Sequence, residues 1–300
     1  MIKASIDIGS NSILLLAGEF KERFFIEKLN LSEVAALGKG IDASKKFSEE
    51  SMQKALSILQ NYTHILKEHS ILPSEVLVTA TEASRVVTNA QEFFEKVKSL
   101  TGLEVQIISG EQEAYYAGLG VSLGNNKEIE SIVLDIGGAS TEIIHIQNNP
   151  YKVLKSVSLP LGSVRALEWL SQKTFSAQTA NIEKNFTSFF PKYTTNKITA
   201  IAGTMTAIAT IMQERTIYSD QAVQGFIFTI DDLQKFIQQF EGWSTDKILS
   251  TYSFLGKRAE TLLSGAKVAL WFAKHLEIKE FEVSTYGLRY GTLFSKKVTI

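Results

Sequence analysis

The chain of 300 residues has no cysteine and only four prolines, and its formal net charge is −1. The absence of cysteine excludes a disulfide framework and a thiolate metal site. No stretch approaches the ~20 apolar residues that a membrane helix requires. The near-zero net charge argues against a protein that nucleic acid or a membrane surface holds by bulk charge. We therefore expect a cytoplasmic protein with no nucleic-acid partner and no membrane partner.

Two segments of the chain repeat one pattern: an apolar strand with an aspartate near its end, a turn of small residues, and a hydroxyl side chain. They are Ile6-Asp7-Ile8-Gly9-Ser10-Asn11-Ser12 and Leu134-Asp135-Ile136-Gly137-Gly138-Ala139-Ser140-Thr141-Glu142. Apolar residues flank both turns, which predicts two β-hairpins. One copy alone is ordinary turn chemistry. Because a carboxylate beside exposed backbone N–H groups can hold a metal ion and phosphate oxygens, the pair predicts two phosphate-binding loops.

The order of the expected elements predicts an α/β fold with internal duplication. In the first half we expect strands over 23–29, 76–79 and 105–108, a helix from Ser48 to about Glu68, a helix capped by Asn89, and a helix from Gly110. The second half is expected to have strands over 132–136, 141–146, 153–159 and 198–201, with helices near 162–170, 177–190 and from Thr204. The polar segment 124–127 predicts two domains, 1–124 and 125–300, and the C-terminal segment could pack back on the first domain.

Eight ordered sequence blocks resemble one known family. They are residues 7–12, Leu37-Gly38-Lys39-Gly40, Ala80-Thr81-Glu82-Ala83-Ser84-Arg85, Ile108-Ser109-Gly110-Glu111-Gln112-Glu113-Ala114, residues 134–142, Leu159-Pro160-Leu161-Gly162-Ser163-Val164-Arg165, Ala202-Gly203-Thr204 and Tyr286-Gly287-Leu288-Arg289. The family is the exopolyphosphatase / guanosine pentaphosphate phosphohydrolase family of the actin-like sugar kinase and heat-shock ATPase superfamily. The resemblance, to the short two-domain form, implies two actin-like (ribonuclease H-like) lobes with mixed sheets, flanking helices and an active site in the cleft between them.

The resemblance also implies roles for single residues. Glu113 is similar to the general base that activates the attacking water, although a glutamate near a helix start is also favoured by the helix dipole. Arg85 is the candidate cation for the transferred phosphoryl group, the alternative being an ordinary surface arginine. Asp135 and Asp7 are expected to hold Mg²⁺, and Glu142 is either a metal contact or a hairpin partner. The expected phosphate-binding residues are Gly9, Ser10, Asn11, Gly137, Gly138, Ala139, Ser140, Thr141, Gly203 and Thr204.

The chain departs from the family pattern at several positions. Ala36 and Tyr115 stand where arginines are common in the family, and Ala139 replaces a glycine. The leading hypothesis is a Mg²⁺-dependent hydrolase that releases orthophosphate from polyphosphate or guanosine pentaphosphate. A binder of polyphosphate or guanosine penta- or tetraphosphate without catalysis is the alternative that the missing arginines favour, and a small-molecule kinase of the same superfamily is the other. A homodimer is the assembly expected if the chain is not monomeric.

Overall fold

The computed structural model describes residues 2–21, 24–124 and 129–295. The chain divides into two compact units: the first unit comprises residues 1–120 and 288–300, and the second unit comprises residues 121–287. Of the expected boundary segment 124–127, residues 125–127 lie outside the described residues.

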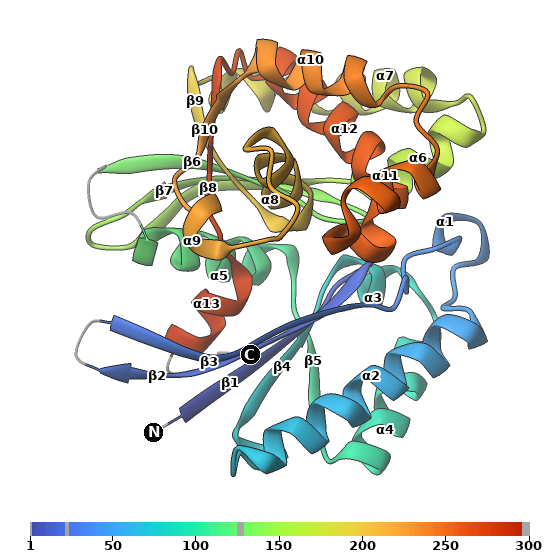
Figure 1. Cartoon of the computed structure of the whole chain (residues 1–300), viewed down its shortest axis with the longest axis vertical. Coiled ribbons are helices and arrows are strands. Elements are labelled where there is room, and N and C mark those ends of the chain that lie inside the picture. The colour runs from blue at the N-terminus through green and yellow to red at the C-terminus, as the bar shows by residue number, and fades with distance from the viewer. Residues whose placement is uncertain (1, 22–23, 125–128, 296–300) are drawn as a thin grey trace. The chain divides into compact units, whose positions relative to one another are not determined.

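The first unit contains a five-stranded sheet with the strand order β3-β2-β1-β4-β5 (Figure 1). Its strands are β1 (Ile2–Ile8), β2 (Ser12–Lys21), β3 (Phe24–Val34), β4 (Val76–Ala80) and β5 (Val105–Ile107). Strand β2 runs antiparallel to both β1 and β3, and β4 and β5 run parallel to β1. Side chains alternate between the two faces of a strand. Ile6 and Ile8 therefore point into the core of this unit, while Ser5 and Asp7 point to the opposite face.

Helices cover both faces of the first sheet. They are α1 (Ile41–Ser44), α2 (Glu49–Glu68), η1 (Pro73–Glu75), α3 (Glu82–Val86), α4 (Ala90–Thr101), α5 (Gly110–Gly124) and α13 (Leu288–Phe294). The core lies on the side of α2 and α4, and α13 packs on the other face, where the hydroxyls of Ser5 and Thr292 lie 2.8 Å apart.

Two expected helix caps have different outcomes. The Ser48 hydroxyl accepts a hydrogen bond of 3.2 Å from Ser51 N, so the expected cap of α2 is confirmed. Asn89 occupies the expected N-cap position of α4, but its side chain makes no capping hydrogen bond to that helix. Its side chain instead accepts from Phe47 N and donates to Phe47 O, at 2.9 and 3.1 Å. Asn89 thus ties the start of α4 to the segment before α2.

The second unit contains a six-stranded sheet with the order β10-β11-β9-β6-β7-β8. Its strands are β6 (Glu130–Ile136), β7 (Thr141–Gln147), β8 (Lys152–Leu159), β9 (Lys197–Ile201), β10 (Ile227–Thr229) and β11 (Glu280–Val283). Strands β8-β7-β6-β9-β11 have the order and directions of β3-β2-β1-β4-β5 in the first unit. The expected duplication is therefore present in the topology, and β10 is added at the edge of the second sheet.

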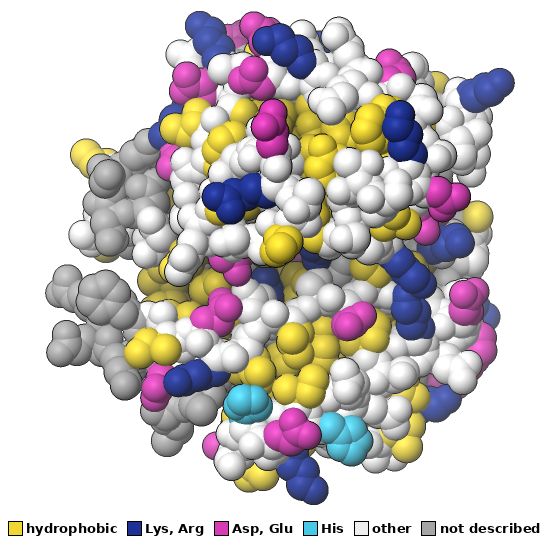
Figure 2. Space-filling model, in the orientation of Figure 1, with side chains coloured by type: hydrophobic (Ala, Val, Ile, Leu, Met, Phe, Trp, Pro, Cys, Tyr) yellow, Lys and Arg dark blue, Asp and Glu magenta, His cyan; other side chains and the backbone are white. Residues whose placement is uncertain are grey.

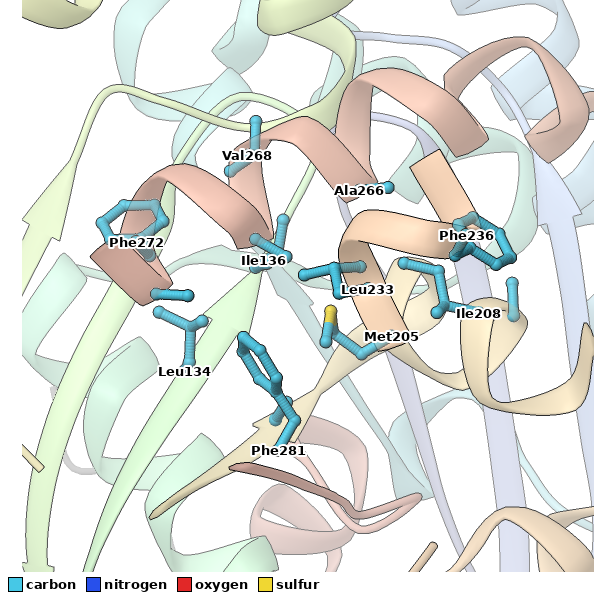
Figure 3. Packing of buried hydrophobic residues seen from close by; sticks show 14 of the residues in the cluster. Leu134, Ile136, Met205, Ile208, Leu233, Phe236, Ala266, Val268, Phe272 and Phe281 are labelled. Atoms are coloured by element: carbon cyan, nitrogen blue, oxygen red, sulfur yellow. The ribbon is translucent and has the colours of Figure 1, made fainter. Parts of the chain in front are cut away.

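Helices also pack on the second sheet. They are α6 (Ser163–Ser171), α7 (Phe175–Phe186), η2 (Phe190–Lys192), α8 (Ala202–Met212), α9 (Asp220–Val223), α10 (Ile230–Phe240), α11 (Thr245–Thr251), η3 (Ser253–Thr261) and α12 (Leu262–His275). Figure 3 shows the core that they form, in which Met205 and Leu233 pack near Leu134, Ile136 and Phe281. Burial of these side chains provides the main driving force for docking the helices. The expected α/β fold with two mixed sheets and flanking helices is confirmed.

The surface shows no charge of one predominant sign on the face drawn in Figure 2, where acidic and basic side chains of the described residues are interspersed. None of the described helices combines the length and the apolar character that would let it cross a membrane. A polyanion bound to such a surface would depend on local groups and on backbone N–H donors.

Candidate functional site

The turn at residues 9–12, here called the Asp7 turn, and the turn at residues 137–140, the Asp135 turn, have the same backbone hydrogen bond. Gly9 N donates to Ser12 O at 3.0 Å, and Gly137 N donates to Ser140 O at 3.0 Å. A Cβ at Gly9 would lie 3.2 Å from Ser12 O, and one at Gly137 would lie 3.1 Å from Ser140 O. Glycine therefore lets both hairpins close tightly.

A glycine-containing segment elsewhere in the chain bonds to each turn: residues 37–40 bond to the Asp7 turn, and residues 159–165 bond to the Asp135 turn. Gly38 N donates to Ser10 O at 2.6 Å, and Val164 N donates to Gly138 O at 2.8 Å. A Cβ at Gly162 would lie 2.5 Å from Gly138 O, which is closer than any real side chain allows. These hydrogen bonds engage one carbonyl group in each turn, those of Ser10 and Gly138.

Asp7 lies near the end of β1 in an unusual electrostatic environment. Its Oδ1 atom is buried and has no hydrogen-bond partner within the described part of the chain. Burial raises the pKa of Asp7 from 3.8 to about 7, although the charge of Arg289 opposes this shift. Its partner across the β1–β2 ladder is Leu14. Asp7 is therefore partly protonated at neutral pH.

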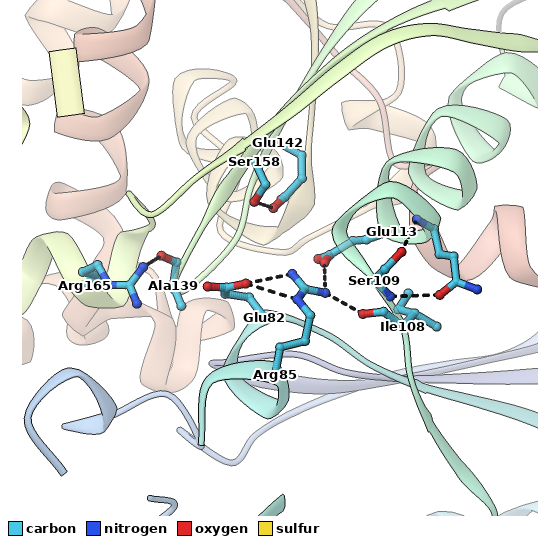
Figure 4. A network of polar contacts seen from close by, with 10 residues as sticks. Glu82, Arg85, Ile108, Ser109, Glu113, Ala139, Glu142, Ser158 and Arg165 are labelled. Atoms are coloured by element: carbon cyan, nitrogen blue, oxygen red, sulfur yellow. Dashed lines mark hydrogen bonds and ion pairs between the residues drawn. The ribbon is translucent and has the colours of Figure 1, made fainter. Parts of the chain in front are cut away.

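Asp135 occupies the equivalent position near the end of β6, but its surroundings are acidic. Its partner across the β6–β7 ladder is Glu142, which is buried and whose Oε1 accepts a hydrogen bond of 2.6 Å from the Ser158 hydroxyl (Figure 4). Two carboxylates on neighbouring strands offer the oxygen ligands that Mg²⁺ prefers, and Mg²⁺ keeps several waters of its own. The described residues hold no group of three acidic, histidine or cysteine side chains placed for a metal. Asp135 and Glu142 thus fit a partly hydrated Mg²⁺ better than a fully enclosed metal.

Arg165, to which the sequence pattern assigned no role, contacts the backbone of the Asp135 turn. It is buried in α6, and its Nη1 donates to Ala139 O (Figure 4). The Thr141 hydroxyl donates to Leu161 O at 2.5 Å, so in this structure it does not offer its proton to a phosphate. The Ala139 carbonyl thus accepts from a cationic side chain, and the N–H groups of the Asp135 turn other than that of Gly137 are the candidate donors for an anion.

The third expected phosphate loop lies at the start of α8. Ala202 has φ of 72°, a left-handed conformation that is strained for a residue with a Cβ and that recurs at functional sites. A Cβ at Gly203 would lie 3.2 Å from the guanidinium carbon of Arg258. Arg258 is not among the residues predicted from the sequence, because it lies in η3, far along the chain from this loop. The glycine lets an arginine approach the backbone of a candidate phosphate loop.

Glu113 lies in the first turn of α5, whose start is closed by a reciprocal pair of hydrogen bonds. Ser109 N donates to Gln112 Oε1 at 2.9 Å, and Gln112 N donates to the Ser109 hydroxyl at 3.2 Å. Glu113 is buried, and its Oε2 accepts a hydrogen bond of 2.9 Å from Arg85 Nη1. Both the helix start and the arginine therefore fix the position of the carboxylate.

Arg85 brings together two acidic side chains of the first unit (Figure 4). Its Nη1 also donates to Ile108 O at 2.7 Å, while Nε and Nη2 donate to Glu82 Oε2 at 3.2 and 2.9 Å. Burial lowers the pKa of Arg85, but the charges and hydrogen bonds of Glu113 and Glu82 outweigh this effect, so the pKa is raised above its ordinary value. Arg85 is therefore permanently charged.

The predicted site residues thus form two groups, each within one unit. The first unit holds Asp7, the Asp7 turn, Arg85 and Glu113; the second unit holds Asp135, Glu142, the Asp135 turn and the Gly203 loop. The structure brings Arg85 and Glu113 into direct contact, and it places Asp135 opposite Glu142.

Comparison with known proteins gives consistent matches. A sequence model described as the Ppx/GppA phosphatase family matches residues 29–299. A bifunctional 3-dehydroquinate synthase/phosphatase of Fusobacterium nucleatum is 30% identical over 240 residues, which cover 74% of this chain and 36% of that protein. A guanosine-5'-triphosphate,3'-diphosphate pyrophosphatase of Aliivibrio fischeri is 27% identical over 302 residues, which cover 97% of this chain and 58% of that protein. The chain therefore spans less than two thirds of the length of these curated relatives.

Solved structures share the fold along the whole chain. The crystal structure of an Aquifex aeolicus member of the Ppx/GppA protein family has a TM-score of 0.77 at 29% identity, with 98% of this chain and 96% of that chain covered. The crystal structure of an exopolyphosphatase from Cytophaga hutchinsonii has a TM-score of 0.84 at 22% identity, with 98% of this chain and 97% of that chain covered.

Proposed function

Because this chain belongs to the Ppx/GppA phosphatase family, we propose that it is a Mg²⁺-dependent phosphoanhydride hydrolase. Its proposed substrates are inorganic polyphosphate, from whose end it releases orthophosphate, and guanosine pentaphosphate. The observation that carries the proposal is the buried carboxylate of Glu113, which Arg85 and the start of α5 hold in one position. A protein that only binds phosphate chains has no use for a fixed proton acceptor.

The chemistry assigns different tasks to the residues. Glu113 accepts the proton of the water that attacks the terminal phosphorus. The N–H groups of the Asp7 turn, the Asp135 turn and the Gly203 loop bind phosphate oxygens, and Arg258 adds a positive charge beside the last of these. Asp135 and Glu142 would hold Mg²⁺, which when bound neutralises part of the negative charge on the phosphates. Asp7 is a weaker candidate because its partner on the neighbouring strand is Leu14, which offers no second carboxylate.

The proposal is tested by measuring orthophosphate release side by side from long-chain polyphosphate, short-chain polyphosphate and guanosine pentaphosphate, with and without Mg²⁺. We expect release from at least one substrate in Mg²⁺ and its loss in EDTA. The Glu113→Gln variant is the control for contaminating phosphatases. Binding of these compounds without release by the wild-type chain would favour the alternative of a non-catalytic binder.

A further inference from the structure

We propose that Glu82 is a positioning residue that keeps Arg85 away from the substrate and commits it to holding Glu113. This inference rests on the proposed function, because it assigns Glu113 the role of the base. It differs from the expectation of the sequence analysis, in which Arg85 itself grips the transferred phosphoryl group. The contacts of the guanidinium carry the argument.

Arg85 has few N–H groups left for a phosphate. A guanidinium carries five N–H donors in a planar fork, and it grips phosphate best with two parallel bonds. Nε and Nη2 both donate to Glu82 Oε2, and Nη1 donates to Ile108 O and Glu113 Oε2. These bonds account for four of the five N–H groups. Each edge of the fork is thus already engaged by a protein oxygen.

The two acidic partners of Arg85 differ in burial. The Glu113 side chain is 9% exposed, whereas the side chains of Glu82 and Arg85 are 19% and 20% exposed. A phosphate arriving from solvent would therefore meet the Glu82 edge of the guanidinium before the Glu113 edge. Glu82 repels that phosphate and occupies the two N–H groups that would bind it.

The local sequence explains why Glu82 can hold this position. Glu82 and Arg85 are three residues apart in the short helix α3, a spacing that brings side chains together on one helix face. The Ile108 carbonyl and Glu113 come from the segment before α5 and from α5 itself. Arg85 is thus bonded both to Glu82 of its own helix α3 and to Glu113 of α5. Removing the Glu82 carboxylate frees the N–H groups on one edge of the guanidinium.

The test compares Glu82→Gln with the wild-type chain in steady-state release of orthophosphate from polyphosphate. Once Glu82 no longer competes, Arg85 contacts the substrate, so we expect KM to fall roughly two- to fivefold, the range for a partly exposed ion pair. We expect kcat to fall as well, because a base that is less firmly held is misplaced relative to the water. The Glu82→Asp variant, which keeps the charge, should restore part of the wild-type behaviour.

A double-mutant cycle shows whether the effect passes through Arg85. In an Arg85→Lys background, adding Glu82→Gln should no longer lower KM, since lysine has no fork for Glu82 to occupy. Glu111→Gln is the matched control: it removes one exposed carboxylate from the first turn of α5, the same turn that carries Glu113. An equal fall of KM in Glu111→Gln, or a fall that persists without Arg85, would overturn the inference.

A measurement that needs no turnover separates this inference from the proposed function. The ¹⁵N NMR signal of Arg85 Nε, assigned with Arg85→Lys, is followed while inorganic tripolyphosphate is added. We expect the signal to move in Glu82→Gln and to stay in place in the wild-type chain. A shift of equal size in both proteins would show that Glu82 does not shield Arg85. Failure of the wild-type chain to release orthophosphate would instead contradict only the proposed function.

Discussion

The Asp7 turn and the Asp135 turn share a backbone but differ in the charges around the aspartate. In both turns a glycine N–H donates a hydrogen bond of 3.0 Å to the carbonyl oxygen of the serine three residues later. Across the neighbouring strands, Asp7 faces Leu14 and then Ser32, whereas Asp135 faces Glu142 and then Ser158. At this position Leu14 leaves the half-buried Asp7 without an acidic neighbour on the next strand, whereas Glu142 forms an acidic pair with Asp135.

This difference shows which part of a duplicated motif is free to diverge. The N–H groups that face an anion depend on the main chain and on glycine, so both copies keep them. The side chain on the next strand sets the local charge without disturbing the turn. We therefore expect cation binding in the second unit, and proton acceptance by Glu113 in the first.

The largest expected effect comes from Glu113. The Glu113→Gln variant keeps the size of the side chain and a hydrogen bond to Arg85 but cannot accept a proton. We expect kcat to fall by roughly 10²–10⁴-fold, with an unchanged Mg²⁺ titration of the residual rate. Glu111→Gln, exposed on the same helix turn, serves as the control. Near-normal turnover would remove Glu113 from the role of base.

Asp135→Asn and Glu142→Gln test the acidic pair of the second unit. A neutral amide is a poorer ligand for a hard cation, so we expect the Mg²⁺ concentration for half-maximal rate to rise by about 10–100-fold. Asp7→Asn, the matched variant of the first unit, should leave this titration nearly unchanged. If Asp7→Asn shifted the Mg²⁺ requirement more than Asp135→Asn, the assignment of the two turns would be reversed.

Asp7→Asn is expected to stabilise the fold in a pH-dependent manner. The folded chain binds the Asp7 proton more tightly than the unfolded chain, with a pKa of about 7 against 3.8, so the free energy of unfolding falls as pH rises between these values. Asparagine does not titrate and so avoids this loss. The free energy of unfolding of Asp7→Asn should exceed that of the wild-type chain by about 1–2 kcal/mol near pH 5 and by about 4 kcal/mol near pH 8, measured by urea unfolding.

The control for this stability measurement is Asp231→Asn, which removes an exposed carboxylate from α10. It should change the free energy of unfolding by less than about 0.5 kcal/mol at either pH. A gain from Asp7→Asn that is the same near pH 5 and near pH 8 would show that Asp7 does not titrate in this range.

The smallest expected effects concern Tyr115 and Ala36. Tyr115 is 44% exposed, so Tyr115→Arg should fold normally. Ala36 has φ of 56° and donates from its N–H to Asn11 O, beside the Asp7 turn. Because alanine already bears the Cβ that strains this conformation, Ala36→Arg adds little further strain.

Each arginine should tighten binding of long polyphosphate by about two- to fivefold, and binding of guanosine pentaphosphate by less, since a longer chain offers more phosphates. Affinity measured by calorimetry should lose this gain as salt is added. Equal effects on both compounds, or a lower melting temperature without tighter binding, would contradict the idea.

The sequence by itself determined the two turns, the capped start of α2 and the α/β order of elements, because each depends on neighbouring residues. A glycine that closes a hairpin and a serine that caps a helix bond to residues within about four positions along the sequence. Helices α9 to α12 were not predicted from the sequence, because their positions depend on packing against a core assembled from distant segments.

Only the tertiary structure decided the contacts that give these motifs their chemistry. The side chain of the N-cap residue Asn89 bonds Phe47 and makes no capping bond to its own helix. Arg258 lies beside Gly203 although it comes from the distant segment η3, and Arg85 is paired with both Glu82 and Glu113. Folding determines which hydrogen-bonding groups and charges lie close enough to pair. The spacing of residues along the chain does not predict these long-range partners. Candidate residues such as Glu113 and Asp135 could therefore be proposed from the order of the motifs along the chain, whereas Arg258 and the pairing of the candidate residues followed from the fold.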